Sequence, residues 1–458
     1  MARLVSPSEF GTYALCTAIV GLTVAFVISA TERALIIESD TDYHGLTMSC
    51  FILGLLGSTI GLVFGAIVAT THLLNIRLEL LCILLFCSLM TSTIIPVKIF
   101  FRRNLKYGII VSCELLGLTL GCGLVAIYLA SLGWGYYAIA SGVVVQNAVT
   151  VIIMLFYSRK LISVSIVPRS IKNLLLKTLG VTRLTAVEVL HFQIPSVFIG
   201  HIGAVPLGLY NRAQTIVQLP AQLITASILR VMISKLKSNI GDKSLSRLNA
   251  KTMISISGCL LASINGGIAG SSKEFTQVLL GSGWSYVGDI VPLLAFTSWS
   301  TMTAWMIAIV SEADGRFKEK AKIQLISSAI TLITLLPLLH LGVVGVITSL
   351  AIGAFVLLTL NIILTSRTLQ ISLFTVGAWI LPGIGLGVVC LCLTRQISTF
   401  MSGQSSAVVL GLQIVGCGIA LVAFLVTTEW TLVRSVLSTI SLRRSERRTA
   451  DSGFDSEK

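Results

Sequence analysis

Charged residues are scarce in this chain. Only 11% of its 458 residues are charged and 55% are hydrophobic, whereas a soluble globular protein carries roughly 25% charged residues. The mean hydropathy is +0.93. A hydrocarbon core about 30 Å thick needs about 20 apolar residues per helix, and stretches of that length recur along the chain. The composition therefore excludes a soluble protein and predicts an all-α, multi-pass membrane protein.

Sequence motifs for catalysis and cofactor binding are missing as well. The chain has no Gly-Lys-Ser/Thr phosphate loop, no His-Glu-x-x-His zinc motif and no Cys-x-x-Cys pair. Its five histidines are scattered, and its ten cysteines lie inside apolar stretches, where a thiol behaves as a small hydrophobic group. We therefore predict no enzyme activity, no metal site, no cofactor and no use of bound ATP.

Thirteen apolar stretches are candidates for membrane-spanning helices. They cover residues 10–30, 46–70, 78–97, 109–130, 136–157, 184–204, 213–233, 252–270, 289–310, 323–341, 343–363, 377–394 and 407–428. The separation of the stretches on either side of Gly342 is the least secure of these boundaries. One span with a re-entrant piece is the alternative there.

Basic residues alternate between the two sides of these spans. The net charge is +14, and 28 of the 33 lysine and arginine residues lie in every second connection and in the C-terminal tail. The positive-inside rule then places the tail in the cytoplasm and Met1 outside. Charge spread over short loops argues against a nucleic-acid partner. Because a chain that starts outside needs an unusual insertion route, we expect a fourteenth, N-terminal helix to be missing.

The order of helices predicts two similar bundles. We divide the chain into an N-terminal bundle (1–157), an amphipathic cytoplasmic linker (158–183), a C-terminal bundle (184–363), two additional helices (364–428) and a basic tail (429–458). Phe10-Gly11-Thr12-Tyr13 is matched by Leu207-Gly208-Leu209-Tyr210, 197 positions later. Parallel repeats of this kind place a substrate cleft between two pseudo-symmetric bundles in secondary transporters.

Several segments resemble a known family. ARLVSPSEFGTYA (residues 2–14) is similar to the ARLLSPEEFGLYAL signature of bacterial Wzx-type polysaccharide flippases. These belong to the multidrug/oligosaccharidyl-lipid/polysaccharide transporter superfamily. GAVPLGLYNRA (203–213) and LLGSGW (279–284) resemble two further segments of that family. The resemblance implies a transporter in the bacterial cytoplasmic membrane. By alternating access it would flip a lipid-linked oligosaccharide of the undecaprenyl-pyrophosphate type, for O-antigen, capsule or exopolysaccharide synthesis.

The same resemblance implies the partners and exposes two departures. The expected partners are the polyprenyl-linked oligosaccharide, membrane lipids, a polysaccharide polymerase and other export components. The family often has an acidic residue where this chain has Ile28-Ser29-Ala30, and an Asn-x-Asp element where it has Gln193-Ile194-Pro195. Both departures concern the chemistry that couples transport to an ion.

Amide side chains inside the spans are candidates for binding sugar hydroxyls, because amides both donate and accept hydrogen bonds. Gln214, Gln218 and Gln222 follow one stripe of a helix, since residues four apart share a face. Gln146 and Asn147 are further candidates. Hydrogen bonding between helices is the alternative for all five, because an amide exposed to lipid is costly.

Charged side chains supply the remaining candidates. Arg33 and Arg230 differ by the repeat offset of 197 and are predicted to face the anionic headgroup from two lips of a cleft. Anchoring by the positive-inside rule is the alternative. Glu188 and His191 are three residues apart on one helix face and could bind a coupling proton or cation. A simple carboxylate–imidazole hydrogen bond is the alternative for them.

Other functions remain open at this point. A multidrug or cation antiporter of the same superfamily would need acidic residues deep in the N-terminal bundle, where only Glu79 and Glu114 stand. A membrane-embedded polysaccharide-synthesis enzyme would need a large charged outer loop, whereas residues 271–288 form a short, nearly uncharged one. A structural membrane scaffold has no feature in its favour.

Overall fold

The computed structural model describes residues 3–37, 46–70, 76–104, 106–158, 174, 178, 189–238 and 243–428. The described chain is helical, with no strand in these ranges. The principal helices are α1 (Pro7–Val20), α2 (Phe26–Ile37), α3 (Leu46–Thr70), α4 (Leu78–Thr93), α5 (Ile95–Arg103), α6 (Tyr107–Leu118), α7 (Ala126–Ser131), α8 (Tyr136–Ser158), Val189–Ile202, α10 (Ala204–Ser238), α11 (Lys243–Gly270), α12 (Ser272–Leu279), α13 (Ser285–Ala313), α14 (Phe317–Leu338), α15 (Gly342–Leu369), α16 (Leu373–Phe400) and α17 (Ser406–Thr428).

Two of the helical connections are π-helical. Gly21–Ala25 joins α1 to α2, and Thr119–Val125 joins α6 to α7. Short 3₁₀ turns stand at Ser282–Trp284 and Leu339–Leu341. A π segment carries an extra residue within an otherwise α-helical run, so each pair of helices still forms a continuous rod.

Eight helical stretches among the described residues are long and apolar enough to cross a membrane, or nine if the bent pair α4–α5 counts as one span. One stretch, Phe317–Leu369, has 53 residues and would measure about 80 Å at 1.5 Å per residue, far more than a bilayer core. It is broken at Gly342, whose φ is +64°. That break confirms the predicted separation of 323–341 from 343–363. The predicted all-α membrane fold is confirmed.

Each of the thirteen predicted spans overlaps a described helix, but several boundaries differ. The prediction 46–70 matches α3, whereas the first span, predicted to end at residue 30, continues in α2 to Ile37. Helix α12 lies in a segment that was predicted to be a loop. The ten cysteines are all free thiols, as predicted.

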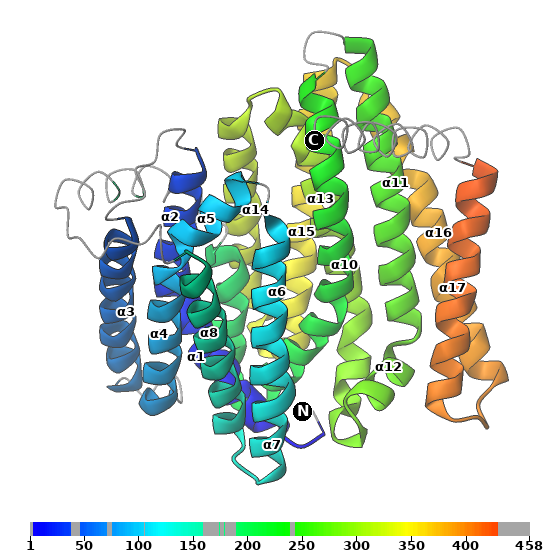
Figure 1. The fold of residues 1–458 in the computed structure, drawn as a ribbon. Coiled ribbons are helices and arrows are strands. Elements are labelled where there is room, and N and C mark those ends of the chain that lie inside the picture. The colour runs from blue at the N-terminus through cyan, green and yellow to red at the C-terminus, as the bar shows by residue number, and fades with distance from the viewer. Residues whose placement is uncertain are drawn as a thin grey trace, which may run out of the picture. The chain divides into compact units, whose positions relative to one another are not determined.

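The helices fall into two compact units. Unit 1 comprises Met1–Thr215, Leu279–Ile290 and Ala321–Gly353, and unit 2 comprises Ile216–Val278, Val291–Lys320 and Ala354–Lys458. They do not follow the predicted domain boundaries, which stay a prediction. In unit 1, α4 packs between α3 and α8, and the π segment Thr119–Val125 packs on α8 (Figure 1). A Cβ on Gly121 would lie 2.3 Å from the carbonyl oxygen of Gly142, so this approach requires glycine.

Unit 2 is built around the contact between α11 and α16, with α17 beside both (Figure 1). A Cβ on Gly266 would lie 2.2 Å from the carbonyl oxygen of Gly387. Small residues that bring helix backbones together are the usual interface in membrane proteins, where the hydrophobic effect between helices is absent. The segment Ser298–Thr303 of α13 is almost entirely buried although it is rich in hydroxyl groups.

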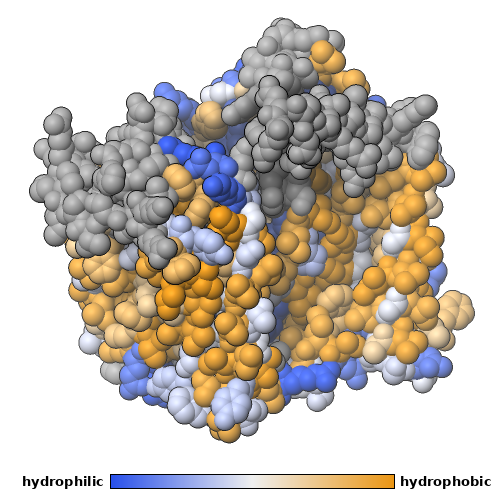
Figure 2. Space-filling model, viewed as in Figure 1, coloured by the Kyte–Doolittle hydropathy of each residue, from blue (hydrophilic) through white to orange (hydrophobic). Residues whose placement is uncertain are grey.

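Large apolar side chains cover the outside of both units. Examples are Leu223 (69% exposed) and Phe374 (91% exposed). In Figure 2, apolar residues cover the middle of the helices and hydrophilic residues gather near their ends. A soluble monomer rarely exposes an apolar surface this extensive, so the pattern fits contact with lipid.

Candidate functional site

The N-terminal turns of α1 and α10 cross at a contact between backbones, within unit 1. A Cβ on Gly11 would lie 1.7 Å from the carbonyl oxygen of Ala204, and a Cβ on Gly208 would lie 1.9 Å from the carbonyl oxygen of Pro7. The two contacts are reciprocal, because Gly208 is Gly11 plus 197 and Ala204 is Pro7 plus 197. The repeat offset found in the sequence is therefore also a spatial relation.

An arginine lies beside this crossing, surrounded by aromatic and amide groups. The guanidinium carbon of Arg212 is 4.3 Å from the centroid of the Phe10 ring, and Phe10 packs edge-to-face on Trp284 with ring centroids 5.5 Å apart. An Nη of Arg212 donates a hydrogen bond to the side-chain carbonyl oxygen of Asn211 over 2.8 Å. Its Nε is buried and has no hydrogen-bond partner among the described residues.

Arg212 is thus a partly buried cation, and no salt bridge to it is present in the described part of the chain. The contacts with Phe10 and Asn211 offset only part of the desolvation cost of an arginine that has no carboxylate partner. It is suited to binding an anionic ligand, because its fork of N–H donors matches phosphate oxygens. In the sequence, Arg212 is one of the five basic residues that lie outside the basic connections and the tail. Its place in the LGLYNRA segment was the available signal.

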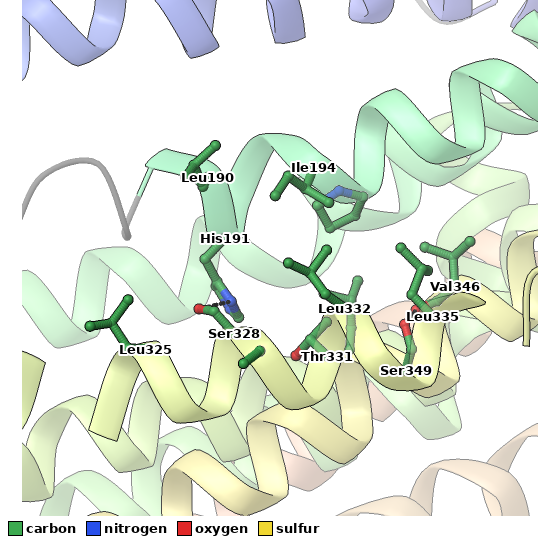
Figure 3. Close-up of a pocket in the computed structure, with 13 residues that line it drawn as sticks. Leu190, His191, Ile194, Leu325, Ser328, Thr331, Leu332, Leu335, Val346 and Ser349 are labelled. Carbon is green, nitrogen blue, oxygen red and sulfur yellow. Dashed lines mark hydrogen bonds between the residues drawn. The ribbon is translucent and has the colours of Figure 1, made fainter. Parts of the chain in front are cut away.

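His191 lines a pocket of about 200 Å³ between the helix Val189–Ile202, α14 and α15, all within unit 1 (Figure 3). Its Nδ1 lies 3.5 Å from the hydroxyl of Ser328. The other lining residues are mainly leucine, isoleucine and valine. Glu188, the predicted partner of His191, lies outside the described residues, so their pairing stays a prediction.

The three glutamines of α10 differ in exposure. Gln214 and Gln218 are half-buried and Gln222 is exposed. Pro220 stands inside the helix between the last two. Proline removes one backbone hydrogen bond and favours a kink, so we expect the helix to bend between Gln218 and Gln222. Contact of these amides with substrate stays a prediction.

Gln146 and Asn147 of α8 contact neighbouring helices of unit 1. The Gln146 amide oxygen accepts a hydrogen bond from the Cys122 thiol over 3.1 Å, and the Asn147 side chain lies next to the thiol of Cys87. These contacts correspond to the alternative interpretation, hydrogen bonding between helices. A role in sugar binding is not tested by them.

Arg33 and Arg230 are placed only by their backbones. Position 33 lies in α2 and position 230 lies in α10, while both side chains lie outside the described part of the structure. Their predicted contact with an anionic headgroup therefore stays a prediction. The sequence predicts a connection at position 33, whereas the structure continues the helix past it to Ile37.

Comparisons with known proteins agree with this architecture. A family model described as polysaccharide biosynthesis protein matches residues 1–289. The succinoglycan biosynthesis transport protein ExoT of Rhizobium meliloti (strain 1021) is 25% identical over 323 residues, which are 65% of this chain. The match spans 61% of the length of that relative.

Solved structures share the fold at low sequence identity. The lipid II flippase MurJ, in an inward closed conformation, matches with a TM-score of 0.71 at 14% identity, over 94% of this chain and 97% of that chain. An inward-facing multidrug resistance MATE transporter matches with a TM-score of 0.57 at 16% identity, over 81% of this chain and 92% of that chain. The eukaryotic MATE transporter AtDTX14 matches with a TM-score of 0.54 at 14% identity, over 80% and 86%.

Proposed function

Because the chain belongs to the polysaccharide biosynthesis protein family, we propose that it flips a lipid-linked oligosaccharide across the cytoplasmic membrane of a bacterium. The substrate would be of the undecaprenyl-pyrophosphate type and the pathway O-antigen, capsule or exopolysaccharide synthesis. The likeness of nearly the whole chain to the fold of a lipid II flippase carries this proposal. The protein acts as a transporter by alternating access and not as an enzyme, with its C-terminus in the cytoplasm.

The charge of the substrate gives Arg212 a role. A pyrophosphate is an anion that must leave water during transport, and a charge-assisted hydrogen bond contributes roughly 1.5–3 kcal/mol. Arg212 offers a guanidinium that no carboxylate neutralises in the described part of the chain. Arg33 and Arg230 are the further candidates from the sequence. Half-buried amides, such as Gln214 and Gln218, would meet sugar hydroxyls.

The described acidic residues argue against the antiporter alternative. An antiporter needs a carboxylate that can exchange a proton for a cation, but each described glutamate of residues 1–158 already has a partner. Glu9 pairs with Ser6, Glu32 with Arg102, Glu79 with Tyr137, and Glu114 with Lys98. Glu188 and His191, three residues apart in the sequence, are instead the candidates for coupling to an ion, and His191 lies in the first turn of the helix Val189–Ile202.

Transport by purified protein tests the proposal. Proteoliposomes would carry a polyprenyl-pyrophosphate oligosaccharide with a fluorophore on the sugar, and a membrane-impermeant reductant would quench the outer leaflet. The proposal expects quenching to exceed the outer-leaflet share only when the protein is present. Efflux of a cationic dye measured in the same vesicles tests the antiporter alternative. Dye efflux without flipping would reject the proposed function.

A further inference from the structure

We propose that the pocket beside His191 holds a short stretch of the isoprenoid chain of the transported lipid. This inference rests on the proposed function and adds a site for the part of the substrate that stays in the membrane. The pocket lies between the helix Val189–Ile202, α14 and α15 (Figure 3). Its residues on α14 run from Leu325 to Leu335, between 8 and 18 residues beyond the start of the helix at Phe317. At 1.5 Å per residue this is about 12–27 Å along the helix, within the membrane-spanning part.

The rim of the pocket is exposed and its floor is buried, but apolar side chains form both. At the rim, Leu190, Leu325 and Leu332 are 44%, 52% and 38% exposed, and on the floor Val346 and Leu335 are almost completely buried. An opening bordered by exposed leucines within a membrane-spanning segment excludes a sugar or a phosphate, because neither would replace its hydration there. The rim is suited to hydrocarbon.

The hydroxyl groups of the pocket are already engaged. The Ser349 hydroxyl donates to the Val346 carbonyl oxygen over 2.8 Å, and the Thr331 hydroxyl donates to the Ser327 carbonyl oxygen over 3.0 Å. Ser328 lies within reach of His191. No lining residue carries a carboxylate. The pocket is therefore apolar in effect, and a hydrophilic ligand would find few free donors and no counter-charge in it.

The isoprenoid chain is the hydrocarbon part of the proposed substrate, so it is the occupant that we assign to the pocket. Apolar cavities of this size stay dry and accept hydrocarbon. Straight acyl chains can pack on the exposed apolar faces that cover both units, whereas a chain with regular methyl branches is wider and benefits from a preformed cavity. A site that retains the chain would hold the lipid anchor while the headgroup crosses.

Photolabelling in proteoliposomes tests the site with the full chain. The probe is a polyprenyl phosphate carrying diazirines along its isoprenoid chain, and phosphatidylglycerol with diazirines on its acyl chains is the comparison. The adducts are located by mass spectrometry. We expect the polyprenyl probe to label Leu190, Leu325 and Leu332 in preference to exposed leucines elsewhere, such as Leu223, and the acyl probe to show no such preference.

Two variants of α14 provide matched controls. Ala329 lines the pocket and is exposed, so Ala329→Trp should fill it and reduce polyprenyl labelling by about tenfold. Ile326 is 48% exposed on the same helix and does not line the pocket, so Ile326→Trp should leave labelling unchanged. Even labelling of all exposed leucines by the wild type, or equal labelling of the pocket by the acyl probe, would overturn the inference without any variant. The flipping assay is scored separately: flipping without pocket labelling rejects only this site, and no flipping rejects the proposed function.

Discussion

Gly11 and Gly208 lie 197 positions apart, and each is pressed against the backbone at the start of the other's helix. The contact is reciprocal. Gly11 contacts Ala204 and Gly208 contacts Pro7, and in each pair of equivalent residues the second is 197 positions after the first. A reciprocal contact of this kind is the signature of a two-fold relation between equivalent elements. Only glycine permits so close an approach, because any Cβ at either position would overlap a carbonyl oxygen.

Alanine at either glycine should destabilise the protein. We expect Gly11→Ala and Gly208→Ala each to cost about 1–3 kcal/mol, because the backbones must move apart. Gly108 of α6 has open space around its Cα and is the matched control. Thermal unfolding of the purified protein in detergent measures the effect. Since both glycines serve one contact, the double variant should cost less than the sum of the two; a Gly11→Ala protein as stable as Gly108→Ala would contradict the packing argument.

Arg212→Gln should separate activity from stability. Loss of the guanidinium is expected to reduce flipping about 10–150-fold, the equivalent of one charge-assisted hydrogen bond. The thermal midpoint should fall only slightly, because the substitution removes the contacts with Phe10 and Asn211 but no ion pair. Arg212→Lys should keep part of the activity. Arg395, an exposed arginine of α16, gives the control Arg395→Gln; equal loss of stability and activity in Arg212→Gln would assign Arg212 to packing alone.

Replacing one amide of α10 should weaken sugar binding moderately. Gln218→Leu is expected to lower glycan export about 2–13-fold, since a neutral hydrogen bond contributes roughly 0.5–1.5 kcal/mol. The amount of protein in the membrane should change little. Gln396, exposed on α16, provides the control Gln396→Leu. Normal export with Gln218→Leu would remove this residue from the substrate path.

The predicted role of Arg33 and Arg230 in substrate capture can be tested by removing the charge with alanine or by keeping the charge with lysine. Arg230→Ala should weaken substrate capture about 10–150-fold and Arg230→Lys less, because lysine keeps the charge but loses the bidentate fork. Arg33→Ala should also reduce export. Protein level and C-terminal orientation must be measured with export, because Arg33 is the only basic residue between Arg3 and Arg77. Full export from correctly inserted Arg230→Ala protein would reject the site.

The spans were predictable because their signal is local. Residues 46–70 form an uninterrupted apolar run and fold as one helix with those bounds. The end of the first span was predicted too early because Thr31-Glu32-Arg33 reads as a polar terminus. In the structure Glu32 pairs with Arg102 of α5, so the helix continues past its own charge. That partner is 70 residues away in the sequence and has no local signature.

The sites depended on contacts that no local pattern reveals. Arg212 appeared in the sequence as one of five basic residues on the outer side, and only the ring of Phe10, about 200 positions earlier, identifies it as partly buried. The residues that line the pocket beside His191 are most often leucines, which are indistinguishable in sequence from those facing lipid. Hydropathy measures how apolar a segment is, but not which apolar side chains leave a cavity between them.

The π segment Gly21–Ala25 changes the angular position, around the helix axis, of every later residue in the first helix. One extra residue turns the subsequent positions by about 100° around the helix axis. Helix α10 begins at the equivalent residue, Ala204, and has no such segment before Ser238. Positions 33 and 230 therefore share a sequence offset but not an angle about their helices. The contact between the two repeats is symmetric at Gly11 and Gly208. Beyond the π segment, positions that are 197 residues apart no longer have the same angle about their helix axes, so the symmetry of the repeat does not extend to them.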